Sequence, residues 1–341
     1  MFALLLAACS SDASPTAPAP LTQPLSATLP PRASLTFMAG FKPQANLPFV
    51  AAYIAQEKGY FAAENLDVTI RHAQTGEHLK LLLANEIDVS TADAGSVLKR
   101  RSDPEAPIKA IALFGQKGQN AYIALQKSGI KTVKDWEGKT FGYKTSVPPE
   151  YLAMVKAASA DRSRIKEVRV GFDVRILTEG QVDLLAVFKS NEPNLVQKLG
   201  FPVTVFDPED VGVPTLGLSY IVTDKALAEK RDALQRFVRA TLRGLAFAKA
   251  NEEAALDIVM KYAPMEDREH QRFMLRQELR DAEGPVAAAN GLGAMSDAQW
   301  KALYDELIAY QALPQPFDYR TAYDPTLVLA AYTGNRLTTP P

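Results

Sequence analysis

Polar and aromatic side chains collect in the loops that follow the predicted strands. In the first series of strands these are Phe41, Gln44, Asn46, Asp93, Ser96, Gln116, Gln119 and Asn120, and in the second series Tyr143, Lys144, Thr145, Lys189, Ser190, Asn191 and Glu192. The set contains amides, hydroxyls and aromatic rings, but no histidine, no cysteine and no serine in a nucleophile-elbow context. Amides donate and accept hydrogen bonds and aromatic rings cover flat groups, so the set favours recognition of a neutral heterocycle or of sugar-like hydroxyls over catalysis.

Several of these residues also fit purely structural roles, and the sequence leaves both interpretations open. Phe41 is either a ring contact or a packing residue, and Tyr220, on a later strand, either covers a flat ligand or belongs to the core. Asn46 precedes Pro48 and suits a turn or a helix cap, while Asp93 suits the N-cap of the helix that follows it. Gln119 and Asn120 also fit an exposed turn between two strands.

Length, charge and cysteine content exclude several classes of protein. The chain has 341 residues, enough for about two domains, and its 38 Lys and Arg against 39 Asp and Glu give a net charge of −1. No cationic excess is available for binding nucleic acid or an anionic membrane surface. The single cysteine, Cys9, permits neither an intrachain disulfide nor a cysteine-ligated zinc, and the three histidines lie outside any ligand motif, so no metal site is expected.

The first 33 residues predict a lipoprotein signal followed by a tether, rather than a folded element. The apolar run from Phe2 to Ala8 ends at Cys9, and residues 6–9 resemble the lipobox of bacterial lipoproteins, so we expect residues 1–9 to be a signal and Cys9 to be lipidated. Residues 10–33 are rich in Pro, Ala, Ser and Thr, which predicts a disordered tether.

Strands and helices alternate through most of the remaining chain. The period of the apolar residues predicts strands at 34–39, 66–70, 87–91, 108–114 and 122–125, with helices at 49–61, 78–85 and 95–101, and a second series of strands at 140–143, 168–172, 183–188 and 203–206. A strand at 216–222 precedes helices at 232–250, 252–262 and 266–280, a helix from the capping box of Ser296 and Gln299 to Tyr310, and a short helix after Pro325.

This order predicts α/β architecture with mostly parallel sheets flanked by helices. We expect a first lobe of residues 34–125 and 216–341, a second lobe of residues 126–215, and a hinge at the two crossovers. A cleft at the carboxyl ends of the strands would receive the loop residues described above. Glu192 directly follows the apolar run 184–188 and is expected to point into this cleft, while Lys144 is either a ligand contact or one half of an ion pair between the lobes.

Two segments identify a family. Residues 54–61 (IAQEKGYF), followed by ENLDV at 64–68, and residues 135–142 (DWEGKTFG) resemble the solute-binding proteins of ABC importers, in the subgroup of sulfonate-binding SsuA and thiamine-precursor-binding proteins. The resemblance covers about residues 34–262. It implies the two-lobed, type II periplasmic-binding-protein (Venus-flytrap) fold and a transmembrane permease as partner.

Shorter segments refine the resemblance. Residues 37–49, 115–119, 142–144 and 188–193 are most similar to riboflavin-binding lipoproteins of the RibY type. The resemblance implies a monomeric, lipid-anchored protein on the extracytoplasmic face of the cell membrane that binds riboflavin, delivers it to the permease and catalyses no reaction. The family's pyrimidine binders use a glutamate, aromatic residues and an asparagine, and Glu192, Tyr143 and Asn46 stand at comparable places.

Three alternatives remain open at this stage. The ligand could be a thiamine pyrimidine precursor of the formylaminopyrimidine kind. The chain could also be a pyrimidine-modifying enzyme on the same fold, although the cysteine cluster of the pyrimidine synthases is missing because Cys9 is the only cysteine. The third alternative is a surface interaction domain without a small ligand.

Overall fold

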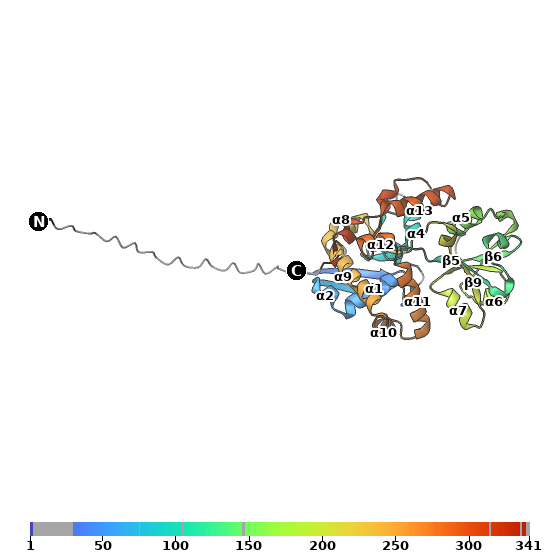
Figure 1. Cartoon of the computed structure of the whole chain (residues 1–341), viewed down its shortest axis with the longest axis horizontal. Coiled ribbons are helices and arrows are strands. Elements are labelled where there is room, and N and C mark those ends of the chain that lie inside the picture. Colours follow the sequence, from blue (N-terminus) through green and yellow to red (C-terminus); the bar gives the residue numbers. More distant parts are fainter. Residues whose placement is uncertain are drawn as a thin grey trace.

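The computed structural model describes residues 1–2, 30–74, 76–103, 106–144, 147–313, 315–334 and 336–338. Two α/β units lie side by side in this part of the chain, each with helices packed around a sheet (Figure 1). The predicted lipobox with Cys9, most of the predicted tether and Thr145 lie outside the described residues. Within the described ranges, no helix has the combined length and apolarity needed to cross a membrane.

The first sheet is assembled from both ends of the chain. Its strands are β1 (Ala33–Ala39), β2 (Leu66–His72), β3 (Ser90–Asp93), β4 (Ile108–Leu113) and β10 (Leu218–Thr223). β1 and β2 are parallel, and β10 runs antiparallel between β3 and β4. A parallel bridge from Phe37 to Val89, just before β3, joins these two groups, so the order is β2-β1-β3-β10-β4.

The second sheet has the order β7-β6-β8-β5-β9. Its strands are β5 (Asn120–Leu125), β6 (Thr140–Tyr143), β7 (Lys166–Arg169), β8 (Leu184–Phe188) and β9 (Val203–Phe206). β6 is parallel to β7 and β8, whereas β5 runs antiparallel to both β8 and β9. The carboxyl ends of β6, β7 and β8 therefore meet at one edge of this sheet.

The two strands that follow the crossovers, β5 and β10, are the ones that run antiparallel to their neighbours. Strand alternation along the sequence did not predict this reversal. β5 also pairs inside the second sheet, so a lobe boundary after residue 125 would separate β5 from its partners. We therefore use "first lobe" for residues 30–114 and 218–338, "second lobe" for residues 120–206, and "crossovers" for residues 115–119 and 207–217.

Helices cover the sheets of both lobes. The first lobe has α1 (Leu47–Glu57), α2 (Tyr60–Ala63), α3 (His78–Leu83), α4 (Ala94–Arg101), α8 (Asp224–Glu229), α9 (Arg231–Ala250), α10 (Glu252–Tyr262), α11 (Arg268–Asp281), α12 (Pro285–Asn290), α13 (Asp297–Ala309) and α14 (Thr326–Leu329), with a short hairpin of β11 (Tyr332–Thr333) and β12 (Arg336–Leu337). The second lobe has α5 (Pro149–Ala157), α6 (Arg175–Thr178) and α7 (Glu192–Lys198). α5 and α7, which the sequence analysis left as loops, begin at proline-containing first turns.

The core of the first lobe depends on close contact between α1 and α9. α9 buries Leu234, Phe237, Leu242 and Leu245 at helical spacing. Gly244 lies on the same buried side, where an added Cβ would stand 2.2 Å from the carbonyl oxygen of Ala51 in α1. Glycine at this position therefore sets the distance between the two helices.

The core of the second lobe is built on aromatic stacking. The rings of Trp136 and Tyr151 lie parallel with centroids 5.8 Å apart, and Tyr151 stacks on Phe141 at 4.2 Å. All three side chains are fully buried. Apolar clusters lie on both faces of this sheet, which is the arrangement expected for an α/β layer structure.

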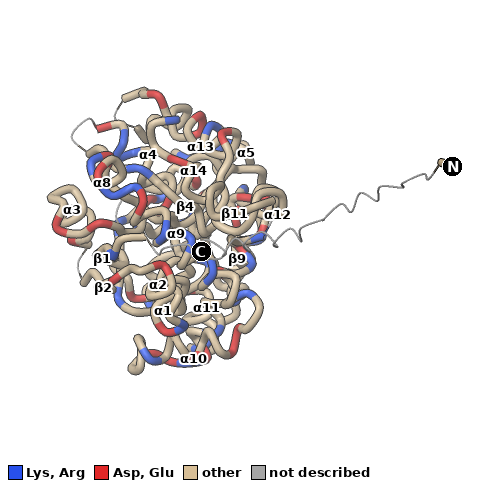
Figure 2. The backbone as a smooth tube through the Cα atoms, turned by 90° about the vertical axis from the view of Figure 1, so that its left-hand side faces the viewer, with Lys and Arg blue, Asp and Glu red and all other residues tan. Residues whose placement is uncertain are grey.

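Charged residues of both signs are spread over the described part of the molecule. Lys and Arg positions and Asp and Glu positions are interspersed along the tube in Figure 2. This distribution agrees with the net charge of −1 and leaves the face in view without a single dominant sign.

Candidate functional site

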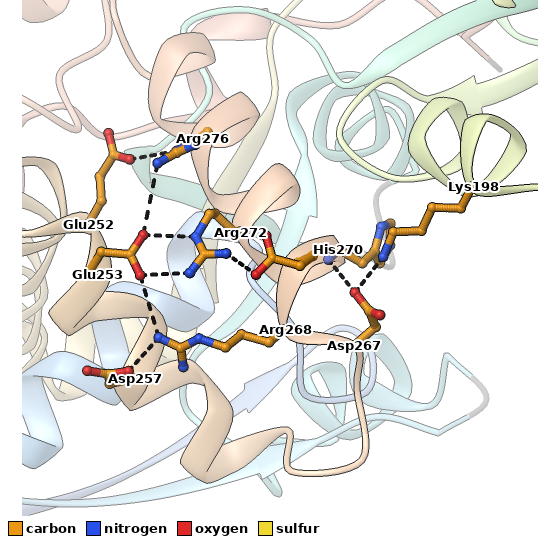
Figure 3. A network of polar contacts seen from close by, with 10 residues as sticks. Lys198, Glu252, Glu253, Asp257, Asp267, Arg268, His270, Arg272 and Arg276 are labelled. Atoms are coloured by element: carbon orange, nitrogen blue, oxygen red, sulfur yellow. Dashed lines mark hydrogen bonds and ion pairs between the residues drawn. The ribbon is translucent and has the colours of Figure 1, made fainter. Parts of the chain in front are cut away.

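The helix α11 of the first lobe faces the second lobe. Ion pairs hold α11 firmly to α10, with Arg272 Nε 2.8 Å from Glu253 and Arg268 2.6 Å from Asp257 (Figure 3). Arg276 adds a 2.9 Å contact to Glu252. These ion pairs therefore attach α11 to the first lobe, independently of its contacts with the second lobe.

Direct contacts join the N-terminal half of α11 to α7 of the second lobe. Lys198 Nζ lies 2.5 Å from Oδ1 of Asp267, the N-cap residue of α11 (Figure 3). The ring nitrogens of His270 lie 2.8 Å from Oδ1 of Asn194 and 2.9 Å from Oδ1 of Asn191. Burial lowers the pKa of His270, which favours the neutral imidazole at physiological pH.

Glu278 is the centre of a polar cluster that connects both lobes. Its Oε1 accepts hydrogen bonds from Asn46 Nδ2 at 3.1 Å, from Gln119 Nε2 at 2.6 Å and from Ser190 Oγ at 2.9 Å. Its Oε2 accepts from the backbone N–H of Leu47 at 3.2 Å. Burial raises the pKa of Glu278, while the hydrogen bonds from Leu47, Ser190 and Gln119 favour its ionised form. We call Glu278, Asn46, Gln119 and Ser190 the bridging cluster.

The loop after β1 is attached to the bridging cluster by amide contacts. Gln44 donates from Nε2 to Oδ1 of Asn46 at 2.5 Å, and Gln271 of α11 accepts from the backbone N–H of Ala45 at 2.8 Å. The Nε2 of Gln271 is buried without a hydrogen-bond partner. An unpaired buried donor costs free energy.

Lys144 and Glu192 form an ion pair inside the second lobe. The other oxygen of Glu192 accepts from the backbone N–H of Phe188 at 2.8 Å. Burial lowers the pKa of Lys144 to about 8. Of the two alternatives for Lys144, the ion pair between the lobes is wrong, because its partner Glu192, the first residue of α7, belongs to the second lobe as Lys144 does.

Lys189 of the second lobe makes ion pairs with a crossover and with the first lobe. Its Nζ lies 2.8 Å from Asp207 in a crossover and 3.3 Å from Asp281 on α11 of the first lobe. Burial opposes the charge of Lys189, but Asp281 and Asp207 together raise its pKa. Both lysines of the predicted loops are therefore neutralised by carboxylates.

Exposed aromatic rings stand beside Lys144. Phe188, at the end of β8, and Phe172, after β7, are 47% and 73% exposed, and the ammonium of Lys144 lies 5.9 and 5.4 Å from their ring centroids. Phe41 of the first lobe is 48% exposed, and Tyr143 is half-buried against Phe141. Large exposed rings at a strand edge are typical of a recognition surface.

Other predicted residues serve the scaffold instead. Tyr220 is fully buried in the core of the first lobe and donates to the carbonyl oxygen of Pro48 at 2.6 Å, so it does not reach the cleft. Asp93 caps α4 by accepting from the N–H of Ser96 at 2.8 Å. Gln116 is held by the carbonyl of Ala294 at 2.8 Å, within the first lobe. Asn120 donates to Glu150 at 3.3 Å.

The structure thus brings together Gln44, Asn46, Gln119, Lys189, Ser190 and Asn191 around α11. The sequence analysis missed the α11 residues themselves, Gln271 and Glu278 above all. Helical spacing in the sequence could have indicated them, because it places Gln271 and Glu278 on the same face of the helix as the apolar Met274 and Leu275. Two cavities, of about 750 and 350 Å³, lie elsewhere, beside α12 and between α5 and α13.

Comparisons with known proteins agree on one family. A sequence model described as "NMT1/THI5 like" matches residues 46–255. The chain is 27% identical over 333 residues to riboflavin-binding protein RibY of Chloroflexus aurantiacus, covering 94% of this chain and 93% of the relative. It is 26% identical over 277 residues to the formylaminopyrimidine-binding protein of Halalkalibacterium halodurans, covering 77% and 82%.

Solved structures agree on the fold. The periplasmic aliphatic sulphonate-binding protein SsuA from Escherichia coli superimposes with a TM-score of 0.65 at 14% identity, over 89% of this chain and 95% of that one. The predicted periplasmic-binding-protein fold is confirmed by this likeness, and with it the two-lobed α/β architecture.

Proposed function

Because the chain belongs to the NMT1/THI5-like family, we propose that it is the ligand-binding component of an ABC-type importer and that its ligand is riboflavin. The relative named as a riboflavin-binding protein aligns with almost the whole chain, which supports this choice. The proposal requires that the two lobes close over the vitamin and release it unchanged to a permease.

The observation that carries the proposal is the bridging cluster. Asn46 of the first lobe, Gln119 of a crossover and Ser190 of the second lobe all donate to one carboxylate, that of Glu278. These donors meet only when the lobes are together. Because the amide nitrogens of Asn46 and Gln119 each carry a second hydrogen, a ligand that accepts from those hydrogens would hold the lobes closed. Each neutral hydrogen bond of this kind contributes about 0.5–1.5 kcal/mol net.

The charge distribution favours an uncharged ligand. Recognition of a sulfonate calls for a cation or a helix N-terminus that is free to pair with it. Lys144 is paired with Glu192, and Lys189 with Asp207 and Asp281. Although the chain shares its fold with SsuA, these two lysines are therefore not free to pair with a sulfonate.

The exposed rings favour a flat ligand. Phe41, Phe172 and Phe188 keep large apolar areas in water, and covering them with an isoalloxazine ring would remove that area from solvent. Tyr143 lies at the same edge of the second sheet as Phe188. Amides of the bridging cluster would then meet the ring edge or the ribityl hydroxyls.

A thiamine pyrimidine precursor is the second candidate ligand. The similarity to a formylaminopyrimidine-binding protein supports it, over a smaller part of the chain. Glu192, Tyr143 and Asn46 would be the pyrimidine contacts in that case. A smaller heterocycle would leave Phe172 uncovered, which a binding comparison can detect.

The cellular setting is also part of the proposal. We expect an extracytoplasmic, monomeric protein held at the membrane by lipid on Cys9, a transmembrane permease as its partner, and no conversion of the ligand. Labelling cells with a fatty-acid analogue, and repeating the labelling with Cys9→Ser, tests the anchor. Loss of the label in the variant is the expected result.

Titration of purified protein with riboflavin, followed by quenching of flavin fluorescence, tests the ligand. One equivalent is expected to bind, and mass spectrometry is expected to recover it unchanged. Riboflavin 5′-phosphate should bind at least tenfold more weakly, because both lysines are already paired. Tighter binding of formylaminopyrimidine would favour the second candidate, tighter binding of an alkanesulfonate would overturn a neutral ligand, and a converted product would indicate an enzyme.

A matched pair of variants tests the aromatic surface. Phe188→Ala should weaken riboflavin binding about tenfold, through loss of ring contact. Leu199→Ala is the control, since Leu199 is 48% exposed, almost the same as Phe188, but lies at the end of α7. Equal effects of the two variants would contradict a role for Phe188 in binding.

A further inference from the structure

A second contact between the lobes is formed by α5 and α13, which lie next to each other at the upper edge of the view in Figure 1. α13 belongs to the first lobe, where Trp300, Leu303 and Leu307 enter the core. Tyr310, directly after α13, packs against the core of the second lobe. Residues of both helices line the 350 Å³ groove between them. Any opening of the lobes must therefore change the contact between α5 and α13.

Each helix of this contact carries a buried carboxylate with an unpaired oxygen. Glu306 of α13 is 7% exposed, and neither of its carboxylate oxygens has a hydrogen-bond partner. Glu150, in the first turn of α5, accepts from Asn120 through Oε1, but its Oε2 is buried without a partner. Burial is the larger cause that raises the pKa of Glu306 to about 8, and the negative charge of Glu150 is the smaller one. Burial also raises the pKa of Glu150.

The groups around this pair do not neutralise it. Tyr122 of β5 is fully buried, its hydroxyl has no partner, and both glutamates raise its pKa after the larger effect of burial. Asp93, at the start of α4, adds a further negative charge that raises the pKa of Glu150. Tyr310 lies near Glu306, and Tyr151 lies near Tyr122. Tyr310 and Tyr151 are neutral phenols at pH 7.

No cation among the described residues is paired with either glutamate. Lys156 of α5 holds its ammonium over the ring of Tyr310, 5.5 Å from the ring centroid. In the same described ranges, no group of three or more His, Cys, Asp or Glu side chains could hold a metal ion. Two ionised carboxylates buried together without a cation would repel each other strongly.

We propose that closure of the two lobes takes up one proton from solvent, which Glu306 holds and donates in a hydrogen bond to the free oxygen of Glu150. The Glu306 O–H then supplies a donor to an acceptor that has none in the present contact. When the lobes open, both carboxylates return to water and the proton returns to solvent. This inference does not depend on which molecule the cleft binds.

The sign of the pH dependence follows from linkage. In the open state Glu306 has the ordinary pKa of a glutamate, about 4.3. In the closed state its pKa is about 8. Between these values closure takes up a proton, so its equilibrium constant falls about tenfold for each pH unit. Below pH 4 and well above pH 8 the two states bind equal numbers of protons, and closure no longer depends on pH through this pair.

The test uses the ligand-free full chain and compares Glu306→Gln with Asp305→Asn. The control removes the same charge from the neighbouring residue, which is exposed and paired with Lys301. X-ray scattering at pH 5, 7 and 9 should show that the wild type and the control expand with rising pH, while Glu306→Gln keeps one radius of gyration. Glu150→Gln is the second variant; because burial is the larger cause of the raised pKa of Glu306, this variant should reduce the pH dependence without abolishing it.

Infrared spectroscopy gives an independent readout of the proton. The wild type at pH 7 should show the C=O stretch of a protonated carboxyl group, and Glu306→Gln should lack it. A wild-type radius that is constant from pH 5 to 9, or a protonated-carboxyl band that survives in Glu306→Gln, would overturn the proposal. Because neither measurement uses riboflavin, failure here is distinct from failure of the proposed ligand.

Discussion

Ser190 of the second lobe donates its hydroxyl hydrogen to Glu278 of the first lobe across 2.9 Å. Glu278 simultaneously accepts from Asn46 and Gln119, so one carboxylate aligns groups from both lobes and from a crossover. If these residues bind the proposed ligand, the carboxylate is the group that positions them.

Replacement of this carboxylate should weaken ligand binding. In Glu278→Gln one acceptor oxygen becomes an NH₂ group, so either the three side-chain donors on Oε1 or the Leu47 N–H on Oε2 lose their acceptor. The unpaired donors would turn away, and we expect the Kd for riboflavin to rise at least tenfold. Glu252→Gln is the control, because it removes the same charge from an exposed ion pair. Fluorescence titration of both variants measures the difference, and equal Kd values would refute the positioning role.

The Lys144–Glu192 pair should determine discrimination between neutral and anionic flavins. In Glu192→Gln the ammonium of Lys144 loses its counter-ion and becomes available to an anion. Binding of riboflavin 5′-phosphate relative to riboflavin should therefore improve about tenfold in this variant. Lys144→Met, which removes the cation, should show no such gain. The ratio of the two Kd values, measured in each variant at pH 7, is the relevant quantity.

Local sequence patterns were sufficient for much of the fold. The predicted bounds of β6, β9 and α10 match the structure, and the capping box of Ser296 and Gln299 is present as expected. These features depend on residues that are near each other in sequence. Strand period, helix period and N-cap chemistry all act over a few residues, so a single sequence records them.

Long-range features could not be derived in the same way. The sheet that β5 joins depends on pairing with β8 and β9, tens of residues away. Tyr220 lies on a strand that is buried on both faces, so alternation gave no indication of which side its ring faces. Glu278 looks like one of many charged residues on a solvated helix until α11 is placed against the second lobe. Tertiary placement, rather than residue type, makes it part of the site.

Gly244 should be intolerant of even a methyl group. A Cβ at this position would overlap the backbone carbonyl of Ala51, and neither helix can move without disturbing the core of the first lobe. Gly244→Ala is expected to lower the free energy of unfolding by about 3 kcal/mol or to prevent folding. Gly171→Ala is the control, since an added Cβ there meets nothing within 4 Å. Denaturant unfolding of the two variants should separate them clearly.

Glu306 should also leave a signature in the stability of the folded chain. Its folded-state pKa of about 8 lies above the unfolded value of about 4.3. The protonated group therefore stabilises the fold fully below pH 4, and this contribution is lost as the pH rises through 8. Glu306→Gln, which stays neutral, should match the wild type in melting temperature at pH 5 and exceed it at pH 9. Asp305→Asn should follow the wild type at both values. A Glu306→Gln curve parallel to that of the wild type across this range would mean that Glu306 is ionised in the folded protein, contrary to its burial without a partner.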